Sequence, residues 1–278
     1  MGTVPGARND DVTVVIANHN YARFLSEAVA SVHGQVGGSP RVVVVDDGST
    51  DADTEPALAA VEAAGAEVLR GPNRGVSAAR NVGLARVRTP YWLVLDADDR
   101  LAPGALDAMR APLERDPRLG YAFGFMSFFG DMSGIVRFPD YDPYRLLYRH
   151  TVGLTALARA EVLRATGGYD PAFAHYEDWE LWVHALAHGH EGMRVGAVTL
   201  EYRRHGGTKL TADRRNYRAT WRDLRRKHGE LYARRGELAQ RSKLGPVRRA
   251  VHRGYWGPRP VPAALEAALY RAIWRTSS

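Results

Sequence analysis

The chain has 278 residues, of which 45% are hydrophobic, and it carries a formal net charge of +7. This length and apolar fraction suffice for one large domain, or for one domain with an appendage, around a sizeable core. The absence of cysteine excludes disulfides, thiolate metal sites and cysteine nucleophiles, and it fits a reducing cytoplasm.

The first hundred residues alternate between strand and helix patterns. Short apolar or β-branched runs, typical of buried parallel strands, lie at residues 12–16, 41–46, 67–69 and 91–95. Helical patterns fill the intervals, at residues 24–32, 51–64 and 75–86. This alternation predicts an α/β fold with a mostly parallel sheet and helices on both faces. Ligands of such sheets bind at the carboxyl ends of the strands.

From about residue 120 the pattern changes to mixed strands and loops. We expect a helix at residues 177–188 and an edge strand at residues 193–202. A single long, Arg-rich helix is expected at about residues 213–243, and a short amphipathic helix at about residues 265–274.

Three carboxylates, Asp96, Asp98 and Asp99, follow the fourth expected strand. Carboxylates this close repel one another unless a positive charge lies between them. Mg²⁺ and Mn²⁺ prefer such oxygen ligands together with substrate phosphates. The alternative is an exposed acidic turn that caps the helix beginning near Pro103. The position directly after a buried strand favours the cation site.

Polar residues also follow the second and third strands. An acid at Asp47 is placed to accept hydrogen bonds from a ribose hydroxyl or a base N–H, so we expect it to contact a ligand. Ser49 or Thr50 is expected to cap the next helix. The segment beginning at Asn73 opens a helix with small residues, and helix N-termini favour phosphate. Arg80 within this helix is expected either against a diphosphate or on the surface.

Glu177 and Asp178 open a predicted helix. The helix dipole favours their ionised form, which suits an acid that takes a proton from a substrate. The alternative is ordinary charge complementarity at a helix N-terminus. Trp179 and Trp182, three residues apart on one face, are expected in the core. His205 is either a third metal ligand, an imidazole facing a leaving diphosphate, or simply part of a loop.

The ordered motifs resemble those of family 2 glycosyltransferases over residues 11–209. They are VVIANHNY at 14–21, VVDDGSTD at 44–51, NRGVSAARN at 73–81, LDADD at 95–99, GGYD at 167–170 and EDW at 177–179. Each motif alone is weak, whereas six of them in this order are specific.

This resemblance implies a GT-A fold and an inverting transfer of a sugar from a nucleotide diphosphate donor. By position, Asp47 would contact the base, Asp96 the ribose or the metal, and Asp98 the metal. Together with the residue patterns above, the predicted site comprises Asp178 and Glu177 for catalysis, Ala17, His19, Asp47, Asn73, Arg80, Asp96 and Ala97 for the nucleotide-sugar, and Asp98, Asp99 and His205 for Mn²⁺ or Mg²⁺. Relatives often have Pro at position 17 and Tyr at position 19.

We predict a catalytic domain over residues 1–210 and a basic helical extension over residues 211–278. Residues 11–100 would bind the nucleotide-sugar, with UDP- and dTDP-sugars favoured, and residues 101–210 would face a hydroxyl acceptor. That acceptor would belong to a cell-surface polysaccharide, a glycolipid or a secondary metabolite. A sugar-phosphate nucleotidyltransferase shares the sheet, but its Gly-rich signature with a Lys near the N-terminus is missing here. A non-catalytic nucleotide-sugar-binding protein would not need Asp98 and Asp178.

The charge is segregated along the chain. Residues 203–278 hold 20 Lys and Arg against 5 Asp and Glu, whereas the rest holds 18 against 26. A basic segment with aromatic residues such as Tyr217, Trp221 and Trp274 suits an anionic membrane surface. The alternatives are an arm packed on its own domain and self-association into a homo-oligomer. Nucleic acid is not expected as a partner, because the body is acidic.

No apolar run reaches the roughly 20 residues that a membrane-spanning helix requires. Residues 121–129 form the best candidate and are too few, and residues 1–11 lack the apolar stretch of a secretion signal. We therefore expect a cytoplasmic protein, either free or peripheral on the inner face of the membrane.

Overall fold

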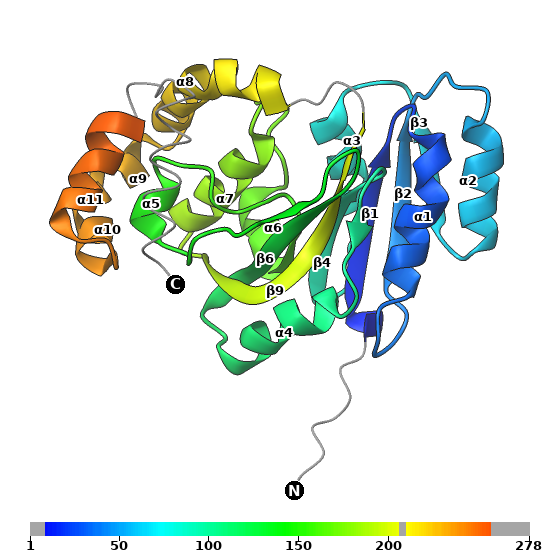
Figure 1. The fold of residues 1–278 in the computed structure, drawn as a ribbon, viewed down its shortest axis with the longest axis horizontal. Coiled ribbons are helices and arrows are strands. Elements are labelled where there is room, and N and C mark those ends of the chain that lie inside the picture. Colours follow the sequence, from blue (N-terminus) through cyan, green and yellow to red (C-terminus); the bar gives the residue numbers. More distant parts are fainter. Residues whose placement is uncertain (1–8, 206–209, 257–278) are drawn as a thin grey trace, which may run out of the picture. The chain divides into compact units, whose positions relative to one another are not determined.

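The computed structural model describes residues 9–205 and 210–256, which belong to two compact units (Figure 1). Unit 1 comprises residues 1–141 and 151–208, and unit 2 comprises residues 142–150 and 209–278. A short segment from the middle of the sequence therefore packs with the C-terminal region. Each unit is described by itself below.

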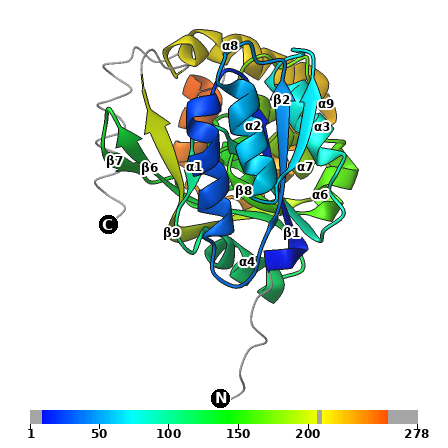
Figure 2. The same ribbon diagram turned by 90° about the vertical axis from the view of Figure 1, so that its right-hand side faces the viewer.

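Unit 1 is built on a mixed, mostly parallel sheet (Figures 1 and 2). Among the described residues its strand order is β3-β2-β1-β4-β8-β6-β9-β5, with β7 paired to β6. The strands are β1 (Val12–Asn18), β2 (Arg41–Asp47), β3 (Glu67–Gly71), β4 (Tyr91–Asp96), β5 (Arg100–Leu101), β6 (Leu119–Gly130), β7 (Gly134–Val136), β8 (Ala156–Arg159) and β9 (Glu191–Arg204). The first four in sequence are parallel, as are β6 and β9, while β8 runs antiparallel between β4 and β6. The predicted fold class is confirmed.

Helices cover both faces of the sheet. In unit 1 they are α1 (Ala22–His33), α2 (Thr54–Ala63), α3 (Val76–Leu84), α4 (Ala105–Arg115), α6 (Ala160–Thr166) and α7 (Glu177–Ala187). Val14 of β1 belongs to the same buried cluster as Leu25 of α1, whereas the next residue, Val15, lies against Gly83 of α3. Since successive side chains of a strand point to opposite faces, α1 and α3 lie on opposite sides of the sheet.

An aromatic stack anchors α7 to the sheet. The ring of Trp182 lies 4.3 Å from that of Tyr121 and 6.3 Å from that of Trp92, measured between centroids. The indole N–H of Trp182 donates to the Gly153 carbonyl at 3.3 Å. Trp179 and Trp182 are both fully buried, so the prediction that they belong to the core is confirmed. This packing fixes the start of α7, where two acids lie.

Unit 2 has a small core of its own. Its helices are α5 (Pro143–Leu146), α8 (Leu210–Lys227), α9 (Gly229–Ala233), α10 (Arg235–Arg241) and α11 (Pro246–Val251), followed by a π-helical turn at His252–Trp256. Trp221 and Tyr232 are buried, and both donate to the Leu147 carbonyl, at 3.1 and 2.6 Å. Leu147, which directly follows α5, thus lies at the centre of the unit.

Several expectations about the second half are corrected. The prediction of a single helix at residues 213–243 is wrong. The helix is interrupted at His228 and Arg234, close to the weak helix formers Gly229 and Gly236. Trp221 is 7% exposed and so is not available to a membrane surface. β9 is not an edge strand, since the two-residue β5 pairs beyond it. The helix expected at residues 265–274, with Trp274, lies outside the described residues.

No helix in the two described stretches combines the length and the apolar character needed to cross a lipid bilayer.

The close approach of α3 to the sheet depends on Gly83. A Cβ at this position would lie 2.3 Å from a methyl carbon of Val15 and 3.1 Å from one of Val45. We expect Gly83→Val to destabilise unit 1 by about 1–3 kcal/mol, the usual cost of overpacking. The melting temperature, monitored by circular dichroism, measures this loss of stability. Gly236→Ala, at a helical glycine with open space around it, is the control, and an equal melting temperature for both variants would contradict the expectation.

Candidate active site

Three carboxylates gather at the carboxyl end of β4. One oxygen each from Asp96, Asp98 and Asp99 lies within 4.8 Å of the others. Burial and the charge of Asp96 raise the pKa of Asp98, and burial with both neighbouring charges raises the pKa of Asp99 well above its usual value. Hard oxygen ligands under such repulsion fit a divalent cation. The alternative of an exposed acidic turn is wrong, because Asp99 is 2% exposed and Gly104 occupies the N-cap of α4.

His205 lies directly beside this cluster. Its Nε2 is 2.9 Å from Oδ2 of Asp98. The imidazole packs between two rings of α1 and its N-cap, with centroids 5.5 Å from Tyr21 and 5.0 Å from Phe24. His205 therefore has a fixed place at the carboxylates. Tyr21 and Phe24 were not identified from the sequence, because only the fold brings them to residue 205.

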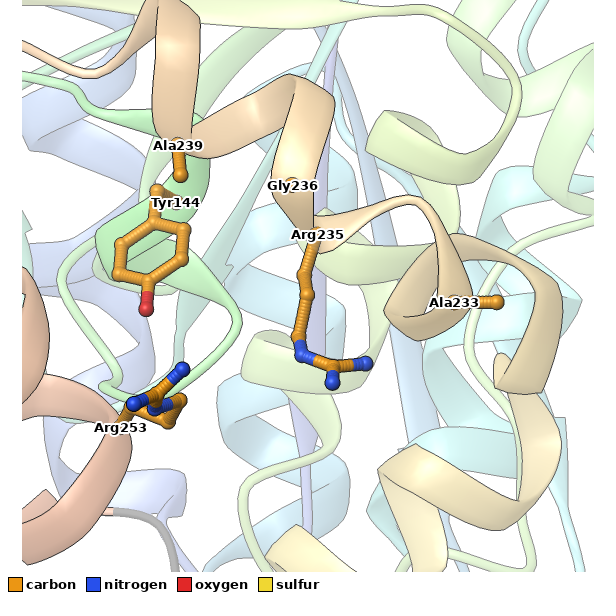
Figure 3. Close-up of a pocket in the computed structure, with 6 residues that line it drawn as sticks. All are labelled: Tyr144, Ala233, Arg235, Gly236, Ala239 and Arg253. Atoms are coloured by element: carbon orange, nitrogen blue, oxygen red, sulfur yellow. The ribbon is translucent and has the colours of Figure 1, made fainter.

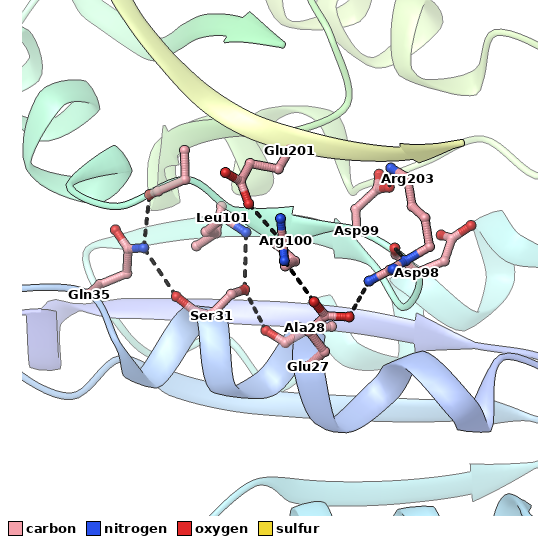
Figure 4. A network of polar contacts seen from close by, with 11 residues as sticks. Glu27, Ala28, Ser31, Gln35, Asp98, Asp99, Arg100, Leu101, Glu201 and Arg203 are labelled. Carbon is pink, nitrogen blue, oxygen red and sulfur yellow. Dashed lines mark hydrogen bonds and ion pairs between the residues drawn. The ribbon is translucent and has the colours of Figure 1, made fainter. Parts of the chain in front are cut away.

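An ionic network holds the acidic loop between α1 and β9 (Figure 4). The backbone N–H of Arg203 donates to Asp99 at 2.8 Å, and its Nε donates to the Asp98 carbonyl at 2.8 Å. Glu27 pairs with both Arg203 and Arg100, the latter at 2.7 Å. Asp99 is thus bound to the chain itself, while Asp98 faces His205.

Arg80 joins the acids after β4 to those at the start of α7. Its Nη2 lies 2.7 Å from Asp96 and its Nη1 lies 2.7 Å from Glu177. The guanidinium also stacks 5.1 Å from the ring centroid of Tyr169. Burial lowers the pKa of Arg80, but the two carboxylates outweigh this effect and raise it overall. Arg80 is 3% exposed, so the alternative of a surface arginine is wrong.

Gly168, the residue before Tyr169, leaves room for the side chain of Asn81. A Cβ on Gly168 would lie 2.5 Å from Oδ1 of Asn81. Asn81 accepts from the N–H of Tyr169 at 2.8 Å and donates to its carbonyl at 2.7 Å. The missing side chain of Gly168 therefore lets α3 hold the segment that leads into α7.

Asp178 lies in the first turn of α7 beside Glu177, and one of its oxygens accepts from the N–H of Trp179 at 2.9 Å. Burial raises the pKa of Tyr169, and the nearby Asp178 raises it further. Tyr176, the N-cap of α7, has a φ of 55°, and Asn20, after β1, has a φ of 60°. In the described part of the chain no other residue except glycine has a positive φ, and such strain is typical of functional sites.

The predicted nucleotide-side residues lie at the ends of β1 and β2. Asp47 is 6% exposed, and its two oxygens accept from the N–H groups of Arg74 and Gly75, each at 2.8 Å. His19 is exposed, with Nδ1 2.9 Å from the Asp47 carbonyl and Nε2 3.3 Å from Nδ2 of Asn73. The carboxylate of Asp47 therefore fixes the loop before α3.

Two alanines complete the predicted set. Ala17 is half-buried and pairs in register with Asp96 of the neighbouring β4. Ala97 is buried within the hydrophobic core cluster. The structure thus brings Ala17 to the acidic end of β4 and turns the Ala97 side chain into the core.

Ser49 links the first two strand ends and does not cap a helix. Its hydroxyl donates to Asp46 at 2.6 Å and accepts from the N–H of Asn20 at 2.9 Å. The N-cap of α2 is Asp53, which makes no side-chain cap. The expectation that Ser49 or Thr50 caps α2 is therefore wrong, because the helix begins later than the pattern suggests.

Comparison with known proteins identifies the family. The model of glycosyl transferase family 2 matches residues 13–166. The chain belongs to this family. The match spans β1 to α6 and includes Asp96, Asp98, Asp99 and Arg80. The predictions of a family 2 glycosyltransferase and of its GT-A fold are confirmed.

Relatives and solved structures agree with this assignment. The succinoglycan biosynthesis protein ExoU of Rhizobium meliloti is 43% identical over 98 residues, which are 34% of this chain and 28% of ExoU. S. aureus TarS 1-349 in complex with UDP-GlcNAc superposes with a TM-score of 0.61 at 17% identity, over 87% of this chain and 70% of that one. The mannosyltransferase PcManGT of Pyrobaculum calidifontis, in complex with GDP-Man and Mn²⁺, gives 0.56 at 20% identity, over 96% and 76%.

The chain spans about a third of the length of the curated relatives that it matches first. The two structural likenesses, at 17% and 20% identity, show the fold.

Replacing Arg80 tests whether it holds the acids together. Arg80→Met leaves Asp96 and Glu177 facing each other without the buried cation, so we expect a loss of about 3 kcal/mol and a fall in melting temperature of roughly 6–12 °C. Arg74→Met removes an exposed arginine from the same motif and is the control. Thermal unfolding measures both variants. An equal fall in the two melting temperatures would contradict the bridging role of Arg80.

Proposed function

We propose that this glycosyltransferase moves a sugar from a nucleotide diphosphate donor to an acceptor hydroxyl with inversion at the anomeric carbon. The observation that carries the proposal is the double ion pair of Arg80 with Asp96 and Glu177. Through this arginine, the acids at the end of β4 and those at the start of α7 border one site. A cation with its diphosphate and a general base would then be neighbours.

The donor class is supported by the structural neighbours. TarS was crystallised with UDP-GlcNAc, and PcManGT with GDP-Man and Mn²⁺. We propose that the nucleotide of this enzyme's donor lies over the ends of β1 and β2, beside His19, Asn73 and the half-buried Ala17. Asp47 would shape this part of the site by fixing the loop before α3. UDP- and dTDP-sugars are the donors to test first.

The cation would be held by Asp98 and His205, with Asp96 and Asp99 alongside. Asp98 and His205 face each other at 2.9 Å, whereas Asp99 is engaged by the N–H of Arg203. When bound, Mn²⁺ or Mg²⁺ would neutralise the diphosphate and make it a better leaving group.

Asp178 would be the general base. At the N-terminus of α7 the helix dipole favours a carboxylate, which keeps Asp178 ready to accept a proton. Asp178 would take the proton of the acceptor hydroxyl while that oxygen attacks the anomeric carbon and the bond to the diphosphate breaks. Glu177, which is paired with Arg80, would position α7 and the arginine. Likeness to a succinoglycan biosynthesis protein supports a polysaccharide acceptor.

Asp178→Asn tests this role. We expect the variant to bind the donor as the unmodified protein does but to lose transfer by a factor of about 10²–10⁴, the usual contribution of a general base. Release of nucleoside diphosphate from a panel of UDP- and dTDP-sugars measures turnover, and calorimetry measures donor binding. Asp53→Asn, at an exposed aspartate that caps nothing, is the control. Unchanged turnover in Asp178→Asn would refute the assignment.

Cation binding should depend on pH. Because burial and mutual repulsion raise the pKa values of Asp98 and Asp99, both groups take up protons at a higher pH than ordinary aspartates as the pH falls. A protonated carboxyl is a poor ligand, so the rise in melting temperature produced by Mn²⁺ should be largest at neutral pH and should fade on acidification. Thermal-shift titrations across pH measure this. An equal Mn²⁺ effect in Asp98→Asn would contradict the proposed site.

A further inference from the structure

Unit 2 contains a cavity of about 320 Å³ (Figure 3). All of its lining residues belong to this unit. They are Tyr144, Ala233, Arg235, Gly236, Ala239 and Arg253. None of the residues assigned above to the nucleotide-sugar, the cation or catalysis contributes to this cavity.

The cavity is lined by two arginines and no acid. Arg235 and Arg253 are both exposed, and in the described part of the chain neither of them pairs with a carboxylate. The nearest acid in sequence to Tyr144, Asp142, is buried and accepts hydrogen bonds from the N–H groups of Arg145 and Lys243 and from Ser242. Two guanidinium groups at one cavity repel each other, and an anion between them relieves that repulsion.

The walls of the cavity are held by hydrogen bonds within unit 2. Nη1 of Arg235 donates to the Tyr232 carbonyl at 3.1 Å, which anchors one edge of its guanidinium and leaves the other N–H groups for a ligand. The Tyr144 ring is buried, and its hydroxyl donates to the Arg249 carbonyl at 3.3 Å. Arg249 in turn donates to the carbonyls of Ala239 and Leu244, at 3.0 and 2.9 Å. A ligand would therefore meet a wall in which Tyr144 and Arg235 are already held in place.

We propose that this cavity binds a phosphate group. Guanidinium matches phosphate oxygens in a bidentate way, which makes a pair of arginines a phosphate site and not merely a positive surface. The whole of unit 2 favours an anion, with 20 Lys and Arg against 6 Asp and Glu. The cavity exceeds the volume of a phosphate ion, so a phosphate ester fits. Its source is either a soluble phosphate ester or the headgroup of an anionic lipid.

The test measures binding to the full chain in two arms. Calorimetry with inorganic phosphate and with glycerol 3-phosphate covers the soluble source. Co-sedimentation with phosphatidylcholine vesicles, with and without phosphatidate, covers the lipid source. The variant is Arg235→Gln with Arg253→Gln. The matched control is Arg218→Gln with Arg222→Gln, which removes the same charge from exposed positions on α8 outside the cavity.

We expect the cavity variant to bind about tenfold more weakly in the arm that corresponds to the source, while the control stays within about twofold. Loss confined to the soluble arm indicates a soluble phosphate ester, and loss in the phosphatidate arm indicates a lipid headgroup. Equal weakening in both double variants, or none in the cavity variant, overturns the proposal. Circular dichroism of each variant separates loss of binding from loss of folding. The single variant Arg253→Gln, which changes an exposed side chain, is measured in the same way.

Discussion

The site depends on one buried cation. Arg80 is almost completely removed from water, and burying a guanidinium without partners is strongly unfavourable. Its partners lie far apart in the sequence of unit 1, with Asp96 at the end of β4 and Glu177 at the start of α7. Because all three charges must meet to be stabilised, α3, β4 and α7 are fixed relative to one another. The geometry of the candidate site is therefore part of the folding of unit 1.

The acidic cluster has the opposite electrostatic problem, an excess of negative charge. Asp96, Asp98 and Asp99 repel one another in a partly buried setting, and burial together with this repulsion raises the pKa values of Asp98 and Asp99. The chain offsets part of this repulsion, through the guanidinium of Arg80 on Asp96, the N–H of Arg203 on Asp99 and the imidazole of His205 on Asp98. Three carboxylates whose repulsion is only partly offset are the arrangement that the proposed cation would stabilise.

The sequence predicts the first hundred residues well because their signals are local. The strand runs and the carboxylates that follow them, such as Asp96, are visible in single short windows, and parallel pairing then brings them to one edge. The partners of Arg80 could not be predicted, since Glu177 lies 97 residues away and the motif says nothing about burial. The break of the expected long helix at His228 was missed for a related reason. The buried contact of Tyr232 with Leu147 depends on tertiary structure, not on helix periodicity.

The aromatic residues of the basic extension show that residue type alone does not reveal which side chains are exposed. Trp221 and Tyr217 suit a membrane interface as residue types, yet both donate hydrogen bonds to carbonyls next to α5, and Trp221 is buried. The aromatic side chains of α8 therefore build the core of unit 2, while arginines such as Arg218 and Arg222 remain on its surface. The phosphate recognition proposed for this unit would then rest on charge and on the placement of guanidinium groups. Such recognition selects anionic groups with a defined shape and does not require insertion of apolar side chains into a bilayer.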